Sequence, residues 1–218
     1  KVETSLNLQG KCIWSFGLCN SKGVVIIINN KCIDVSQYHI DMIGRLIYID
    51  FTFLNDHSYR LINIYCPNDC NDRNICLNEL IPFLVVARQV ILAGDFNFIM
   101  NSKLDKIGGN LEKGTLGSKL FKNIIDRHKL IDCFRHMYPT KRAVSWFKEN
   151  KQGNSDYDFI GTRIDRVYVS NLSVKAISNS TIMPCTVSDH NFVSLTLSIL
   201  DDLSIGKSYW KLNNDLFK

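Results

Sequence analysis

Four short segments, far apart in the chain, carry side chains suited to phosphate chemistry. They are residues 63–68, 94–97, 163–165 and 188–190, and each lies beside a strand-like apolar run. Side chains at the ends of neighbouring strands converge at one edge of a sheet, where ligands of α/β proteins usually bind. Acids, amides, a histidine and a tyrosine at such an edge can hold a hard cation and a phosphate. The pattern therefore indicates a metal-dependent phosphoesterase.

The second segment, Gly-Asp-Phe-Asn, places an acid and an amide two positions apart. Asp95 and Asn97 therefore share one side of an extended segment and can reach the same phosphate. The carboxylate could activate a water molecule while the amide holds a non-bridging oxygen. A turn with Asp and Asn after a strand is more often structural than catalytic, so this motif gains its weight from the other three.

The last two segments can form an acid–histidine pair. A carboxylate from Asp165, bonded to His190, would raise the imidazole pKa and give a cation that binds or protonates a phosphate oxygen. Tyr65 ends a strand-like run just before Pro67 and Asn68, which allows a functional hydroxyl; the alternative is a buried aromatic residue. We interpret the other four histidines as surface or core residues: His39, His57, His128 and His136.

The bulk composition is that of an ordinary globular chain of one large domain. The sequence has 218 residues, of which 45% are hydrophobic and 22% charged. No apolar run approaches the ~20 residues of a membrane-spanning helix. The eight cysteines contain no Cys-x-x-Cys pair, which favours reduced thiols over a zinc site or a disulfide framework.

The positive charge is concentrated in one half of the chain. Residues 119–166 contain 11 Lys or Arg against 6 Asp or Glu, a surplus that equals the net charge of +5 of the whole chain. The same stretch carries Trp146, Phe147, Tyr157 and Phe159, and such a mixture suits contact with a phosphate backbone. The alternative is a solvated basic surface, which charge alone favours.

Strands dominate both halves of the predicted secondary structure. Alternation and β-branched runs predict strands at residues 24–28, 47–53, 60–65, 90–93, 143–147, 163–170 and 192–200, and a weaker one at 174–183. Helices are expected at residues 72–87, where Pro82 should kink or restart the helix, and at 119–129. The turn at residues 55–58 predicts a hairpin.

In this order the motifs resemble the exonuclease–endonuclease–phosphatase superfamily, and most of all the apurinic-like endonuclease domain of LINE-type (non-LTR) retrotransposons. Residues 104–109, 131–135 and 145–146 add similar stretches, and residues 210–213 are similar to the linker that precedes the reverse transcriptase. The resemblance implies an α/β (α+β) fold: a DNase I-like, four-layer sandwich of two packed β-sheets flanked by helices. We expect residues 1–200 to form this domain and residues 201–218 to be a linker toward a reverse transcriptase-like region.

The resemblance also implies a function. The expected enzyme is a Mg²⁺-dependent phosphodiesterase, for which Mn²⁺ could substitute, that nicks double-stranded DNA and leaves a 3′-hydroxyl as a primer for reverse transcription. An intracellular, nuclear location and no membrane partner are expected with it. Two alternatives stay open: a small-molecule phosphatase of the same superfamily, and a truncated, inactive remnant. A non-catalytic DNA-binding module would need a helix-turn-helix or finger signature, which the sequence lacks.

Residue by residue, the resemblance assigns the chemistry. Asp95 matches the residue that orients or deprotonates the attacking water, and Asn97 matches its phosphate-binding neighbour. His190 matches the histidine that contacts the phosphate, and Asp165 the acid that orients it. Tyr65 completes the catalytic set.

The binding residues come from the same comparison. Asn68 matches an asparagine that contacts the scissile phosphate, and Arg163 and Trp146 are expected to bind phosphate or DNA. Asp189 matches an acid near the metal, and Glu3 the metal-binding carboxylate. The strand and the asparagine turn that precede this glutamate in the family have no counterpart here. We therefore expect the domain to lack its N-terminal strand and these 218 residues alone to be poorly soluble and nearly inactive.

Overall fold

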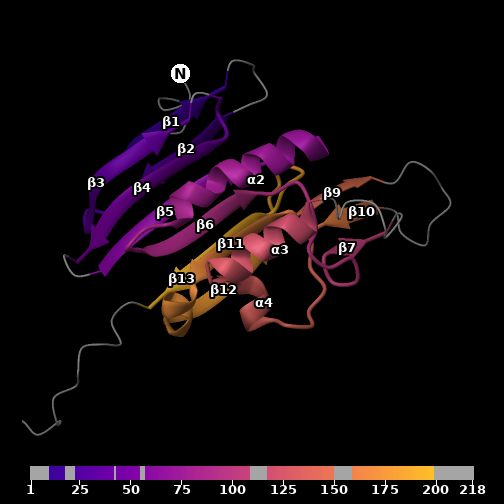
Figure 1. The fold of residues 1–218 in the computed structure, drawn as a ribbon. Helices are drawn as coiled ribbons and strands as arrows, with labels where there is room; N and C mark the ends of the chain where they lie inside the picture. The colour runs from indigo at the N-terminus through magenta and orange to yellow at the C-terminus, as the bar shows by residue number, and fades with distance from the viewer. Residues whose placement is uncertain are drawn as a thin grey trace, which may run out of the picture.

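A six-stranded sheet forms the centre of the molecule in the computed structural model, which describes residues 10–17, 23–41, 43–54, 57–108, 117–149 and 159–198 (Figure 1). Glu3, Tyr157 and the expected linker at 201–218 lie outside the described residues. The strands of this sheet lie in the order β3 (Ile33–Ile40), β4 (Leu46–Phe53), β5 (His57–Tyr65), β6 (Gln89–Asp95), β11 (Asp165–Ser170) and β8 (Leu130–Asp132).

The middle of this sheet is built from apolar runs that are buried on both faces. The first six residues of β4 are all buried, and β4 forms the predicted antiparallel hairpin with β5. β5 and β6 are parallel, and α2 (Cys70–Leu84) connects them. Asp69 caps α2, since its carboxylate accepts hydrogen bonds from the backbone N–H groups of Asn71 and Asp72. Pro82 lies in the last turn of α2 and the helix ends two residues later.

Helices and strands cover opposite faces of the sheet (Figure 1). On one face, α2 and α3 (Ser118–Arg127) pack over a core that includes Phe96, Phe121 and Tyr168. On the other face, the hairpin of β1 (Lys11–Phe16) and β2 (Gly23–Ile28) encloses a second core with β4 and β5. The hairpin of β12 (Ile177–Met183) and β13 (Phe192–Leu197) contacts β11. The expected α/β arrangement of packed sheets with helices over the central sheet is confirmed.

A separate three-stranded sheet lies at the end of the molecule where β6 ends and β11 begins. Its order is β7 (Lys106–Ile107), β10 (Phe159–Thr162) and β9 (Trp146–Glu149). A single bridge between Trp146 and His190 connects this sheet to the segment before β13. The remaining short elements are α4 (Cys133–Met137) and the 3-10 helix η1 (Asn171–Ala176).

The predicted elements are present, with shifted ends. The strand expected at 143–147 begins at Trp146 instead, because residues 143–145 form a loop whose N–H groups bond to other segments. The strands β1, β3, β7, β8 and β10 were not predicted; in β3 every residue is exposed or half-buried, so the sequence shows no apolar run there. None of the described helices is long and apolar enough to cross a membrane.

Candidate active site

The register of the central sheet places three of the predicted residues side by side. Asp95, the last residue of β6, is the partner of Tyr65 in the parallel strand β5. It is also the partner of Asp165, the first residue of β11. The polar ends of three neighbouring strands therefore meet at one edge, as the sequence predicts.

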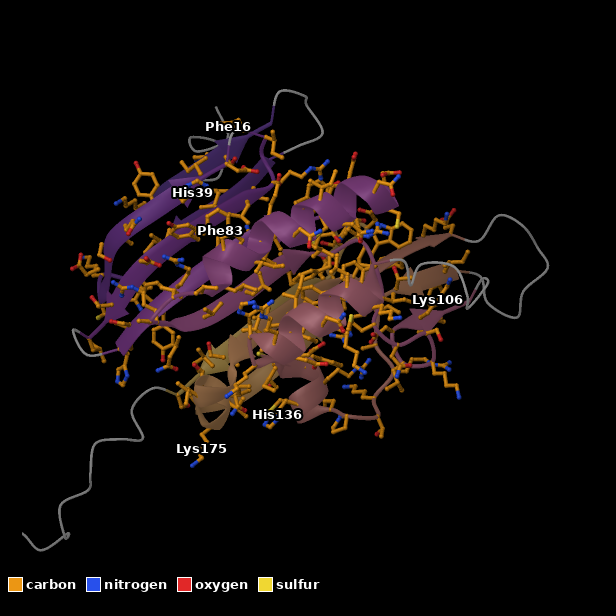
Figure 2. The ribbon with its side chains drawn as sticks, viewed as in Figure 1. Phe16, His39, Phe83, Lys106, His136 and Lys175 are labelled. Carbon is orange, nitrogen blue, oxygen red and sulfur yellow. The ribbon has the colours of Figure 1, made fainter. Side chains whose placement is uncertain are left out.

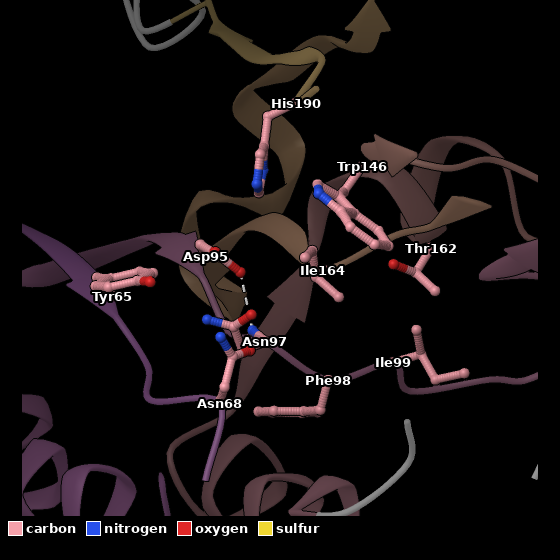
Figure 3. A pocket seen from close by; sticks show the side chains of 10 residues that line it. All are labelled: Tyr65, Asn68, Asp95, Asn97, Phe98, Ile99, Trp146, Thr162, Ile164 and His190. Atoms are coloured by element: carbon pink, nitrogen blue, oxygen red, sulfur yellow. Dashed lines mark hydrogen bonds between the residues drawn. The ribbon is translucent and has the colours of Figure 1, made fainter. Parts of the chain in front are cut away.

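Glycine and asparagine backbones shape the segment that leaves β6. Gly94 has a φ of +147°, and a Cβ there would lie 1.8 Å from the backbone oxygen of Ile64, so only glycine fits. Asn97 has a φ of +54°, an uncommon conformation for a residue with a side chain. Its N–H donates to Asp95 Oδ1 (2.9 Å) and its Nδ2 donates to the backbone oxygen of Cys66 (2.7 Å). Figure 3 shows Asp95 and Asn97 joined in this way.

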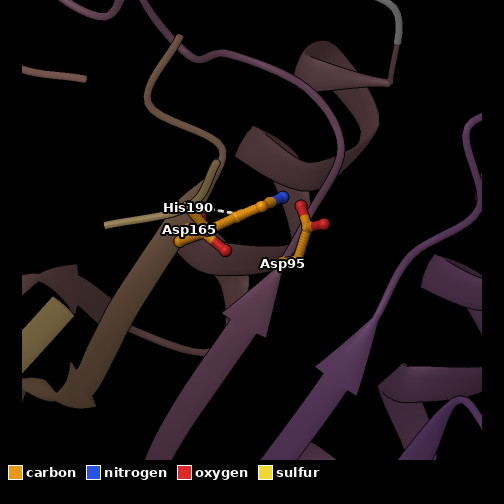
Figure 4. Close-up of side chains that lie close together, drawn as sticks. All are labelled: Asp95, Asp165 and His190. Atoms are coloured by element: carbon orange, nitrogen blue, oxygen red, sulfur yellow. Dashed lines mark hydrogen bonds and ion pairs between the residues drawn. The ribbon is translucent and has the colours of Figure 1, made fainter. Parts of the chain in front are cut away.

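The expected acid–histidine pair is present. His190 Nδ1 lies 2.9 Å from Asp165 Oδ2, and Figure 4 shows the outer edge of the imidazole ring turned toward Asp95. The hydroxyl of Ser145 donates to the same Asp165 oxygen (2.7 Å) and accepts from the N–H groups of Ile164 (3.0 Å) and Asp165 (2.8 Å). Ser145 is completely buried. It therefore holds the Asp165 carboxylate in place for His190.

Burial and neighbouring charge change the proton affinities of Asp95 and His190. Burial, and then the charge of Asp165, raises the pKa of Asp95 to about 6. The hydrogen bond to Asp165 is the main cause that raises the pKa of His190 above its usual value. Ligand atoms of Asp95, Asp165 and His190 all lie within 4.8 Å of one another. The arrangement joins a carboxylate of raised basicity to a histidine that favours its cationic form.

A pocket of about 310 Å³ opens over these residues (Figure 3). Five of its ten lining residues were predicted from the sequence to be functional and also belong to the edge described above or its loops: Tyr65, Asn68, Asp95, Asn97 and His190. A sixth predicted residue, Trp146, forms part of one wall. The remaining lining residues are Phe98, Ile99, Thr162 and Ile164. The pocket therefore combines acidic, amide and imidazole groups with an apolar wall.

Sequence reasoning missed two kinds of contribution to this site. Ser145 entered only as part of a family-like stretch, and its bond to Asp165 depends on a contact 20 residues away in the chain. Thr162 and Ile164 flank the buried Arg163, so the period of two in this segment could have indicated that they face away from it.

Trp146 and Asp189 form the rim next to His190. The indole N–H of Trp146 donates to Asp189 Oδ2 (2.8 Å), and the Asp189 side chain is exposed. The backbone oxygen of Asp189 accepts from the N–H of Phe147 (3.1 Å). These bonds fix the segment that carries His190 against β9.

The prediction that Arg163 binds DNA is wrong for this structure. The residue is 1% exposed, and its guanidinium bonds to Asp105 (2.7 Å) and Asp132 (2.8 Å). Arg135 bonds to the same Asp105 carboxylate. Arg166 is also buried. The basic surplus of residues 119–166 thus overstates the charge available at the surface, because part of it lies in buried networks.

The histidines outside the site have structural settings (Figure 2). His39 of β3 stacks on Tyr48 and lies against Phe83 of α2, with ring centroids 5.4 and 5.0 Å away. His136 is exposed on α4. Neither contributes to the pocket.

The donor set at the pocket fits a hard divalent cation. Carboxylate and amide oxygens, the donors that Mg²⁺ prefers, are supplied to the pocket by Asp95, Asn68 and Asn97. Asp189, expected from the sequence to be a metal ligand, lies at the rim beside His190 and does not line this pocket. The oxygen of Asp165 that faces His190 is engaged by Ser145 and His190. The other metal ligand expected from the sequence, Glu3, lies outside the described residues.

Comparisons with known proteins agree with this geometry. A curated relative, the transposon TX1 uncharacterized 149 kDa protein of Xenopus laevis, is 25% identical over 224 residues; the match covers all of this chain and 16% of the relative. This chain thus spans about a sixth of that relative's length.

Solved structures are similar in fold. A 3′-5′ exonuclease of Neisseria meningitidis superposes with a TM-score of 0.70 at 21% identity, covering 89% of this chain and 82% of the other. An AP endonuclease of Archaeoglobus fulgidus gives a TM-score of 0.71 at 16% identity, covering 89% and 81%. Residues 41–190, which include all four motifs, match one sequence family. The resemblance expected from the motifs is thereby confirmed: this chain belongs to the endonuclease/exonuclease/phosphatase family.

Proposed function

We propose that this chain is a divalent-metal-dependent DNA endonuclease that cuts one strand and leaves a 3′-hydroxyl. The observation that supports it best is the arrangement of Asp95 opposite the Asp165–His190 pair, with the amides of Asn68 and Asn97 beside them in one pocket. Membership in the family and the nuclease folds of the structural neighbours support hydrolysis of a phosphate ester.

The residues divide the reaction between them. Asp95, with its raised pKa, accepts a proton from the attacking water, whose oxygen forms the new bond to phosphorus. The bond from phosphorus to the 3′ oxygen breaks, and that oxygen leaves as the hydroxyl. His190, held by Asp165, carries positive charge next to the phosphate and can supply the proton that the leaving oxygen needs. Asn68 and Asn97 hold non-bridging oxygens, and the Tyr65 hydroxyl borders the same pocket.

A bound Mg²⁺ would neutralise charge on the phosphate and polarise it for attack. In our proposal Asp189 and Glu3 would hold it. The predicted metal dependence follows from this assignment.

DNA is the substrate class that the surroundings favour. Lys148 lies with its ammonium 5.9 Å from the centroid of the Trp146 ring, and Trp146 lines the pocket. Lys141, Arg142 and Lys148 are all exposed on or near β9. Exposed cations next to an aromatic wall suit a nucleic-acid backbone. Because the chain is similar to a transposon protein, we further propose that the 3′-hydroxyl primes reverse transcription and that the protein acts in the nucleus.

The experiment is cleavage of supercoiled plasmid with Mg²⁺ and with EDTA. We expect nicked circles in Mg²⁺ alone, whose ends a DNA polymerase extends without prior phosphatase treatment. A chain that hydrolyses p-nitrophenyl phosphate but leaves the plasmid closed would instead be a small-molecule phosphatase. A chain that removes only a terminal 3′ phosphate from an oligonucleotide would be a DNA phosphatase.

A further inference from the structure

The two amide residues of the pocket lie on separate irregular segments. Asn68 follows β5 and Asn97 follows β6, and the sheet hydrogen bonds of these strands end at Tyr65 and Asp95. The left-handed conformation of Asn97 costs of order 1 kcal/mol or more, so the surrounding structure must hold it. The placement of both amides therefore depends on groups outside the sheet.

Arg73 joins the two segments. It lies in the first turn of α2 and is 4% exposed. Its Nη1 donates to the backbone oxygens of Pro67 (3.0 Å), Asn68 (2.8 Å) and Asn97 (3.5 Å). One nitrogen thus contacts the carbonyl groups of both amide residues.

Arg166 holds Phe98, the residue that follows Asn97. It follows Asp165 in β11 and is 1% exposed. Its Nη1 donates to the backbone oxygen of Phe98 (2.8 Å). Its guanidinium carbon lies 4.8, 4.7 and 6.0 Å from the ring centroids of Phe96, Phe98 and Phe121. The Phe98 ring also lies 5.8 Å from the guanidinium of Arg73, so it contacts both arginines.

Arg166 has an unusual setting for a buried cation. It forms no ion pair within the described residues, and its Nε and Nη2 have no hydrogen-bond partner there. Arg60 and Arg163, which are also buried, each bond to a carboxylate. Burying an unpaired charge costs several kcal/mol, which favours a role for Arg166 other than stabilising the core.

We propose that Arg73 and Arg166 are positioning residues that brace the segments at 66–68 and 96–98, so that Asn68 and Asn97 face the same phosphate. The expected effect on the cleavage rate rests on the proposed function, whereas the expected effect on the position of the two segments does not. A brace that shifts by about 1 Å can change a rate by roughly 10²-fold. Neither arginine lines the pocket, so each acts through the amides.

The test compares variants of both arginines in the full chain. Arg166→Met and Arg73→Met keep much of the side-chain length and remove the donors, whereas Arg166→Lys and Arg73→Lys keep one donor and the charge. The matched control removes a buried pair on the same sheet, Asp50→Asn with Arg60→Met, whose side chains bond to each other at 2.7 Å. Plasmid nicking gives kcat and KM, and thermal unfolding shows that each variant is folded at the assay temperature.

We expect both methionine variants to lower kcat roughly 10- to 100-fold with a smaller change in KM. The lysine variants should recover part of the loss. The control should leave kcat within about twofold, because it lies away from the pocket. Unchanged kcat in the folded methionine variants, or an equal loss in the control, would overturn the proposal.

A second measurement separates this inference from the proposed function. The backbone N–H of Asn97 donates to Asp95 Oδ1, so its hydrogen exchange reports the segment directly and needs no DNA. We expect faster exchange at Asn97 in each arginine variant that folds, with the control unchanged. Unchanged exchange refutes the brace even if the wild type cuts DNA. Faster exchange in a protein that never cuts DNA supports the brace and refutes the proposed function.

Discussion

Replacing Asp95 with asparagine should stabilise the folded protein at neutral pH while it abolishes cleavage. Burial, followed by the charge of Asp165, raises the pKa of Asp95 from 3.8 to about 6. In the unfolded chain the carboxyl has its ordinary pKa. Between the two values the folded state binds the proton more tightly, so this group favours folding below pH ~4 and loses that contribution as the pH rises through ~6. Asparagine carries no such charge and keeps an oxygen that can accept the Asn97 N–H.

The size of the effect follows from the two pKa values. We expect the Asp95→Asn variant to exceed the wild type in unfolding free energy by ~0.6 kcal/mol at pH 4 and by ~3 kcal/mol at pH 8. For a domain of this size, the larger value corresponds to a rise in Tm of about 6–12 °C. Urea unfolding between pH 4 and 8, in EDTA so that no cation neutralises the carboxylate, measures the difference.

The matched control is Asp126→Asn, an exposed carboxylate on α3. It should change the unfolding free energy by less than about 0.5 kcal/mol at every pH. Two results would contradict this reasoning: an Asp95→Asn variant no more stable than the wild type at pH 8, or a stability difference that does not grow with pH. Either would show that the ionised Asp95 carboxylate does not destabilise the folded protein. Its assignment as a base of raised pKa would then fail.

Two further predictions concern the pair and the turn. Asp165→Asn and His190→Ala should each lower nicking by roughly two to four orders of magnitude, and the double variant should cost little more than the worse single one because the two act as a unit; independent, additive losses in plasmid nicking would contradict this. Gly94→Ala should lower the unfolding free energy by ~2 kcal/mol or more, since its Cβ would lie 1.8 Å from the Ile64 oxygen. Urea unfolding checks it, and wild-type stability in this variant would show that β5 and β6 can separate there without cost.

The site was predictable from the sequence where chemistry coincides with the end of an apolar run. Tyr65, Asp95 and Asp165 each lie at the end of a strand whose pattern is clear, and the sheet register then places them together. His190 lies before β13 and not at the end of a strand, but the motif at residues 188–190 and the possible acid partner Asp165 indicated its role. The local sequence pattern is sufficient to predict these positions, because the apolar pattern that predicts each strand also locates the strand end at which the polar side chain lies.

What the sequence could not show depends on distant contacts. Arg163 lies in a motif typical of the site, yet its guanidinium turns away to Asp105 and Asp132, which are 58 and 31 residues away in the chain. Arg166 and Arg73 carry no local signal of burial in the sequence, and only the fold shows that both are buried. The strand β3 was missed for a related reason, since its exposed residues carry no apolar pattern.

The most direct test of the proposed function is Mg²⁺-dependent nicking of supercoiled plasmid by the wild type and by Asp95→Ala. Both are expressed as residues 1–218. We expect the wild type to nick the plasmid in Mg²⁺ and not in EDTA, and Asp95→Ala to be slower by roughly two to four orders of magnitude. Full nicking by Asp95→Ala, or no nicking by the wild type, would contradict the proposal.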